Sequence, residues 1–204
     1  VTPSHPQRDR KMMMRGLVAG CSRRAMSTAA PIASRFAVIG AGRMAEAMIG
    51  GMMAGGLQPA ESTHLFDTNP ERLDVCVKRW SGIQTHASAT SCIENADLVL
   101  VAVKPQQMQS VLKDISHAVP KSALVVSIAA GCPIDMFLEE LPTRSVCRAM
   151  PNTPAVIGQG MSVWTATEGC TEAQRTQAQT LLSCFGEVLL CLAFEPVDWQ
   201  MRIR

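Results

Sequence analysis

The chain has 204 residues, which gives room for one good-sized domain and a fragment of a second. Hydrophobic residues make up 47% and charged residues 18%, so a core can be buried. Residues 1–35 hold seven basic residues and one acidic residue, whereas the remainder holds 12 basic and 16 acidic residues. The part expected to fold is therefore mildly acidic, which argues against a nucleic-acid partner.

Residues 1–35 are predicted to be a disordered leader of the transit-peptide type. Residues 10–45 contain no acidic residue, while Arg and Ser recur, as is typical of organelle presequences. The apolar stretch "GLVAG" is too short for a secretory signal. We expect a mitochondrial or plastid location. The alternative is a disordered, untranslated or non-functional leader on a cytoplasmic protein. Because the chain begins with Val1, the natural start is open among Met12, Met13, Met14 and Met26.

After the leader, apolar strands alternate with helices. The predicted strands cover residues 36–39, 63–66, 82–86, 97–103, 123–131, 145–150, 160–166 and 187–192. The predicted helices cover residues 43–54, 70–80, 88–95, 105–116, 133–141 and 172–185, with Thr171 capping the last. This alternation predicts an α/β fold with a Rossmann-like, doubly wound, mostly parallel sheet over residues 36–191.

The eight cysteines carry no C-x-x-C spacing, and most lie in apolar runs. We interpret them as buried thiols of a reducing compartment, and we expect no metal site. The longest uninterrupted apolar run, residues 98–103, is far too short to span a membrane, so no membrane partner is expected.

A glycine-rich turn follows the first predicted strand. Its residues fit G-x-G-x-x-G/A: Gly40, Ala41, Gly42, Arg43, Met44 and Ala45. In a dinucleotide site, Gly40 permits the tight turn, Gly42 lets a pyrophosphate approach the backbone, and Ala45 lets the helix pack against the sheet. The helix N-terminus then faces the phosphates. The alternative is a plain glycine turn between a strand and a helix.

The second predicted strand ends at Asp67, 25 residues past Gly42, where an acidic residue would bind ribose hydroxyls. A carboxylate at this position favours NADH, because it repels a 2′-phosphate. Thr68 and Asn69 can hydrogen-bond a phosphate, and Arg72 could reach it, so the choice between NADH and NADPH stays open with NADH slightly favoured. The alternative is that Asp67 only caps the next helix.

Two further motifs lie where predicted strands end, and ligands bind at the carboxyl ends of strands in such sheets. The first is "AVKP", which consists of Ala102, Val103, Lys104 and Pro105. The second is "RAMPNTP", in which two prolines stiffen the loop around Asn152 and Thr153. The alternatives are an ordinary solvated lysine and a rigid turn without chemistry.

Together these motifs resemble the pyrroline-5-carboxylate reductase family. "IGAGRMAEAMIGG", "DLVLVAVKPQ", "LVVSIAAG", "RAMPNTPAVIGQGM" and "CFGEV" match that family in order and spacing over residues 36–188. The resemblance implies that NADPH or NADH delivers hydride to the ring C=N of 1-pyrroline-5-carboxylate, giving L-proline. It implies that residues 40–45 hold the pyrophosphate and that Asp67, Thr68 and Asn69 meet the adenosine ribose. It also implies that residues 102–105 run beside the cofactor near the nicotinamide, and that Asn152 lines the reaction face.

The family continues into a helical domain that makes the dimer and holds the substrate, whereas residues 192–204 do not match it. We therefore expect a truncated product or a partial gene model, with little turnover by this chain alone. The catalytic residues stay unknown, since the substrate-side residues belong to that domain, and the full-length form is expected to be a homo-oligomer. The alternative functions are a non-catalytic dinucleotide-binding module and another dehydrogenase of similar fold.

Overall fold

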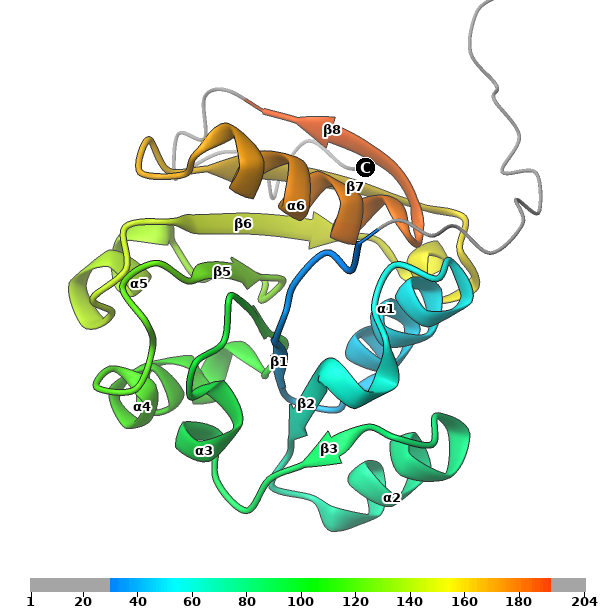
Figure 1. Ribbon diagram of the computed structural model, residues 1–204. Helices are drawn as coiled ribbons and strands as arrows, with labels where there is room; N and C mark the ends of the chain where they lie inside the picture. Colours follow the sequence, from blue (N-terminus) through cyan, green and yellow to red (C-terminus); the bar gives the residue numbers. More distant parts are fainter. Residues whose placement is uncertain (1–29, 192–204) are drawn as a thin grey trace, which may run out of the picture.

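The computed structural model describes residues 30–191, which form an eight-stranded sheet with helices on both faces (Figure 1). The strands are β1 Phe36–Ile39, β2 Thr63–Phe66, β3 Gln84–Thr85, β4 Leu98–Val101, β5 Leu124–Ser127, β6 Val146–Pro151, β7 Gly160–Ala166 and β8 Gly186–Leu190. The α-helices are α1 Arg43–Ala54, α2 Pro70–Arg79, α3 Ala89–Ile93, α4 Pro105–Ile115, α5 Ile134–Glu140 and α6 Glu172–Ser183. Two short 3₁₀ helices are η1 Ala60–Ser62 and η2 Thr153–Ile157.

The strand order is β3-β2-β1-β4-β5-β6-β7-β8. Strands β1 to β6 run parallel to one another, β7 is antiparallel to β6, and β8 is parallel to β7. The chain winds outward from β1 in one direction and from β4 in the other, so the order reverses between these two strands. The predicted Rossmann-like, doubly wound and mostly parallel sheet is confirmed.

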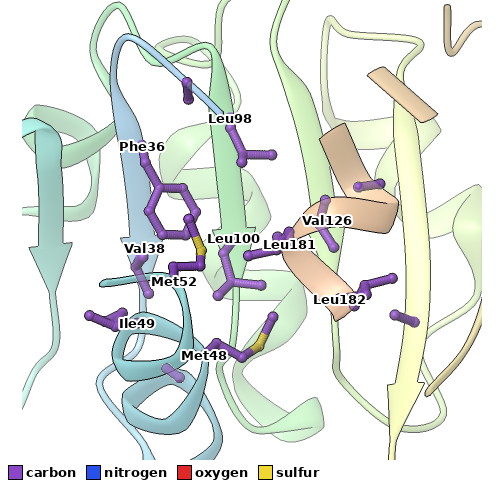
Figure 2. Packing of buried hydrophobic residues seen from close by; sticks show 14 of the residues in the cluster. Phe36, Val38, Met48, Ile49, Met52, Leu98, Leu100, Val126, Leu181 and Leu182 are labelled. Atoms are coloured by element: carbon purple, nitrogen blue, oxygen red, sulfur yellow. The ribbon is translucent and has the colours of Figure 1, made fainter. Parts of the chain in front are cut away.

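The core has two layers because both faces of the central strands are buried. Phe36 and Val38 of β1 pack against α1, whereas Ala37 and Ile39 point to the opposite layer. Residues of α1, α2 and α6 share the first layer, and residues of α3, α4 and α5 share the second. Figure 2 shows Met48, Ile49 and Met52 of α1 and Leu181 and Leu182 of α6 packing over β1, β4 and β5. Apolar runs buried on both faces are typical of parallel strands.

Most predicted elements are confirmed, but four strands, β3, β4, β5 and β8, are shorter than predicted. Strand β4 ends at Val101 and β5 at Ser127, so residues 102–103 and 128–131 form loops at the sheet edge. The predicted N-cap Thr171 is confirmed: its hydroxyl accepts from the Gln174 amide at 3.2 Å, and Gln174 Oε1 accepts from the Thr171 amide at 3.0 Å. Such a reciprocal pair satisfies two helix-terminal donors.

The residues just before β1 already contact the domain. The Ile32 amide donates to Leu57 O at 3.0 Å, Ala33 is buried, and the Arg35 amide donates to Asp97 Oδ2 at 3.0 Å. The packed part of the chain therefore begins several residues before the predicted boundary at Phe36. The remainder of the predicted leader, residues 1–29, and the predicted tail, residues 192–204, lie outside the described residues.

The seven described cysteines are free thiols, and all are buried or partly buried, as predicted. Among residues 30–191, no cluster of three or more His, Cys, Asp or Glu side chains could hold a metal ion. None of the helices that the structure describes is long and apolar enough to cross a bilayer.

His64 of β2 and His86, which follows β3, lie against each other, and we expect them to make the stability of the domain sensitive to acid. His64 Nδ1 lies 2.8 Å from His86 Nε2, and burial, with Arg35 and His86 adding to it, lowers the pKa of His64 to about 4. An unfolded histidine titrates near pH 6.5, so the unfolded chain binds more protons between pH 6.5 and 4. We expect the free energy of unfolding to fall over this range by roughly 2 kcal/mol on account of His64. Urea unfolding at pH 7 and pH 4.5 measures the loss.

The matched variants are His64→Gln and His117→Gln, since His117 is exposed. His64→Gln should reduce the difference in stability between the two pH values, and His117→Gln should leave it unchanged. An equal pH dependence in the parent and in His64→Gln would show that His64 is not the acid-sensitive group.

Candidate cofactor-binding site

The loops that carry the predicted site residues meet at one edge of the sheet. Ile39 is paired with Phe66 on one side and with Val101 on the other, so β1, β2 and β4 end at the same level. The glycine turn, the loop that begins at Asp67 and the loop that begins at Ala102 therefore leave the sheet side by side. This edge lies between β1 and β4, where the strand order reverses, and ligands bind at such points in doubly wound sheets.

Gly40 makes the turn that ends β1. Its φ is +98°, and its amide donates to Phe66 O at 2.7 Å. A Cβ at this position would lie 2.8 Å from Ala102 O. Only glycine permits both this dihedral angle and this approach of the loop after β4 to the turn.

Gly42 lies open to the outside of the turn. It is the N-cap of α1, and no side chain caps this helix end. The nearest atom to a Cβ placed on Gly42 would be Arg72 Nη1, at 3.9 Å. The helix N-terminus therefore presents backbone amides and the positive end of its dipole to an open space, and such a helix start binds anionic phosphates.

The remaining residues of the turn anchor helix α1. Ala45 is 1% exposed and lies in the core layer under α1, so the predicted close packing of the helix on the sheet is confirmed. Met44 packs against the same layer, whereas Arg43 is exposed and lines a groove of about 670 Å³ along α1. The turn is thus fixed from inside and accessible from outside.

The Asp67 carboxylate is bonded to the backbone of two loops. Its Oδ2 accepts from the Ala41 amide at 2.7 Å, and its Oδ1 accepts from the Asn69 amide at 2.8 Å. Arg72 Nη1 lies 3.8 Å from Asp67 Oδ2. The cap of α2 is Asn69, whose Oδ1 accepts from the Glu71 amide at 2.9 Å. The alternative in which Asp67 itself caps the helix is therefore wrong.

The "AVKP" motif continues the edge beside the glycine turn. The Ala102 amide donates to Ile39 O at 2.9 Å, and Val103 Cγ1 would lie 3.3 Å from a Cβ on Gly40. Lys104 is the exposed N-cap residue of α4, and Pro105 occupies its first turn. The structure thus places Ala102 and Val103 against the turn, while Lys104 and Pro105 start the next helix.

Asn152 follows β6, which extends beyond β5 and stays paired with β7. Ser127 at the end of β5 pairs with Arg148, and β6 continues to Pro151. The Asn152 Oδ1 atom accepts from the Met161 amide at 2.9 Å, and its backbone oxygen accepts from the Ala155 amide at 3.0 Å. This side chain therefore holds the η2 turn against β7, and its place on a reaction face stays a prediction.

The sequence motifs did not predict one contact of the site, the hydrogen bond between Asp67 and Ala41. The hydrogen bond between Asp67 and Ala41 joins two loops that are 26 residues apart, and it follows from the alignment of β1 with β2. The sequence spacing placed Asp67 at the site, but its partner there is the turn itself.

Fold and site together define a dinucleotide-binding domain of the Rossmann type. A family model described as "NADP oxidoreductase coenzyme F420-dependent" matches residues 35–131. Pyrroline-5-carboxylate reductase from Escherichia coli is 35% identical over 150 residues, which are 73% of this chain and 55% of that protein. The structure of a pyrroline-5-carboxylate reductase from Coxiella burnetii matches with a TM-score of 0.74 and 27% identity, covering 78% of this chain and 59% of that one.

The resemblance to pyrroline-5-carboxylate reductase is confirmed by these matches. Prephenate dehydrogenase from Aquifex aeolicus matches with a TM-score of 0.64 at 14% identity, over 78% of this chain and 62% of that one, which shows a shared fold alone. The chain spans a little more than half the length of the curated relative from E. coli.

Proposed function

We propose that this chain carries the cofactor-binding part of an NAD(P)H-dependent reductase that converts 1-pyrroline-5-carboxylate to L-proline. The observation that supports it is the open, uncapped start of α1 at Gly42, at the edge where β1, β2 and β4 end. When bound, a nicotinamide cofactor supplies a hydride, and the protein supplies binding and orientation. Residues 40–45 would hold the pyrophosphate, and residues 102–105 would run beside the cofactor toward Asn152.

Another dehydrogenase of similar fold is the less favoured function. In structural superpositions this chain is 27% identical to a pyrroline-5-carboxylate reductase and 14% identical to a prephenate dehydrogenase of the same fold. The motifs "SIAAG" and "MPNTP" lie on the β5 and β6 loops of the same sheet edge. Because these two motifs match the pyrroline-5-carboxylate reductase family in order and spacing, they favour the imine reductase over a hydroxy-acid or prephenate enzyme.

The first test is cofactor binding by the chain itself. Titration followed by the fluorescence of the reduced nicotinamide should give saturable binding of NADPH or NADH. Excess ADP-ribose, which carries the pyrophosphate without the nicotinamide, should compete. No saturable binding of either nucleotide to folded protein would contradict the proposal.

The second test is the reaction. A chimera joins residues 30–191 to the C-terminal part of the E. coli relative, and proline is measured after incubation with 1-pyrroline-5-carboxylate and NADPH. We expect proline from the chimera and none from the chimera carrying Gly42→Val. A chimera that binds NADPH but forms no proline, and that instead oxidises prephenate or a hydroxy acid with NADP⁺, would favour the second function.

We also propose that the full-length protein is a homo-oligomer directed to the mitochondrion, the latter on the acid-free, Arg-rich composition of residues 10–35. A fusion of residues 12–35 to a fluorescent reporter should enter the organelle. Replacing Arg15, Arg23 and Arg24 by Glu should keep the reporter in the cytosol. Cytosolic fluorescence from the unmodified fusion would contradict the targeting proposal.

A further inference from the structure

We propose that this site selects NADPH over NADH, that Arg72 binds the 2′-phosphate, and that Asp67 is a positioning residue for the glycine turn. This inference rests on the proposed function, because it concerns the adenosine end of the same cofactor. It reverses the preference for NADH that an acidic residue after β2 suggests.

Asp67 is poorly placed to select the ribose. Each of its carboxylate oxygens accepts a hydrogen bond from a backbone amide, Ala41 at 2.7 Å and Asn69 at 2.8 Å. Its side chain is only 10% exposed. An acidic residue that selects NADH must direct its oxygens to the ribose hydroxyls, whereas these oxygens already accept from the backbone and leave little of the side chain exposed. The negative charge is balanced by these amides and by the Arg72 guanidinium.

Arg72 occupies the position that a phosphate-binding cation requires. Its side chain is 50% exposed, and it lies on the first turn of α2, where the helix dipole adds positive potential. Its Nη1 is 3.8 Å from Asp67 Oδ2, a distance for an ion pair and longer than a hydrogen bond. The same atom is 3.9 Å from the position of a Cβ on Gly42. The guanidinium therefore borders the open space in front of the turn.

Of the two neighbouring polar residues, Asn69 has a structural role and Thr68 is free to meet a ligand. Asn69 is used by the fold, since its side chain caps α2 through the Glu71 amide. Thr68 is exposed on the loop between Asp67 and α2, and its hydroxyl adds a neutral hydrogen-bonding group. Guanidinium and hydroxyl together suit a phosphate monoester, which accepts several hydrogen bonds and carries a charge that arginine matches. The neutral 2′-hydroxyl of NADH would gain far less binding free energy from such a cation.

The experiment measures the dissociation constants of NADPH and NADH for the parent chain and four variants. Arg72→Gln and Arg72→Lys test the cation, and Asp67→Asn tests the carboxylate. Lys78→Gln is the matched control, because it removes one exposed positive charge from the last turn of the same helix. Urea unfolding of each variant shows whether it folds.

We expect the parent to bind NADPH more tightly than NADH. Arg72→Gln should weaken NADPH binding by ~10- to 100-fold and change NADH binding by less than about twofold. Arg72→Lys should recover part of the affinity for NADPH, and Lys78→Gln should leave both constants within about twofold. Asp67→Asn should weaken both nucleotides by the same factor, because it loosens the turn that both share.

Three results would overturn the inference while leaving the proposed function intact. One is a parent chain that binds NADH more tightly than NADPH. The second is an Arg72→Gln variant whose affinities for NADPH and NADH fall by the same factor. The third is an Asp67→Asn variant that binds NADPH more tightly and NADH more weakly than the parent, which would show that Asp67 selects the cofactor. A folded parent that binds neither nucleotide contradicts the proposed function itself.

Discussion

The Gly42→Val variant is expected to fold like the parent and to bind NADPH and NADH roughly 100-fold more weakly. Gly42 has φ −73° and ψ 170°, an extended conformation that a β-branched residue adopts readily. A Cβ there meets nothing closer than 3.9 Å. The side chain would instead fill the space in front of the α1 amides, where a pyrophosphate approaches the backbone. Losing two charge-assisted hydrogen bonds is enough for an effect of this size.

The measurement is nucleotide titration together with urea unfolding of the same samples. Ser110→Val is the matched control, since it adds the same branched side chain at an exposed position of α4 and should leave binding unchanged. Gly42→Ala should give an intermediate affinity. Parental binding by a folded Gly42→Val protein would remove the phosphate role from this turn and leave the plain glycine turn as the correct interpretation.

The Gly40→Ala variant is expected to lose about 4 kcal/mol of unfolding free energy. Gly40 has φ +98°, which costs an L-residue energy in any surroundings. A methyl group there would also lie 2.8 Å from Ala102 O and 3.0 Å from Ala102 C, both backbone atoms of the neighbouring loop. Since neither atom can rotate away, β1 and β4 would have to separate at the edge that carries the site.

Gly56→Ala separates the two causes. Gly56 has φ +64°, and a Cβ there would meet nothing within 4 Å. This control carries the dihedral cost without the clash, so it should lose about 1 kcal/mol. Urea unfolding of both variants gives the comparison. Equal losses at Gly40 and Gly56 would show that the close approach of Ala102 contributes nothing to stability.

The class of the fold, and the meeting of the glycine turn, Asp67 and Ala102 at one sheet edge, were predictable from sequence, because both depend on local patterns. Four-residue apolar runs between helices are typical of strands buried on two faces, and β1 and β2 have the predicted bounds. The caps were equally local, as Thr171 at the start of α6 shows. Parallel pairing then brings every strand's carboxyl end to one edge, so Gly40, Asp67 and Ala102 had to lie together once the alternation was recognised.

The roles of individual side chains at that edge were decided by the tertiary structure. Spacing predicted a ribose contact for Asp67, but the register of β1 with β2 brings its Oδ2 atom 2.7 Å from the Ala41 amide. The Asn152 Oδ1 atom likewise accepts a hydrogen bond from the Met161 amide of β7, because the antiparallel β6–β7 pair brings the two residues together. The termination of β4 at Val101 and β5 at Ser127 was also hidden, since the apolar runs continue past the sheet. Sequence patterns report which residues are near a site, whereas hydrogen-bond partners depend on distances of a few tenths of an ångström between segments far apart in the chain.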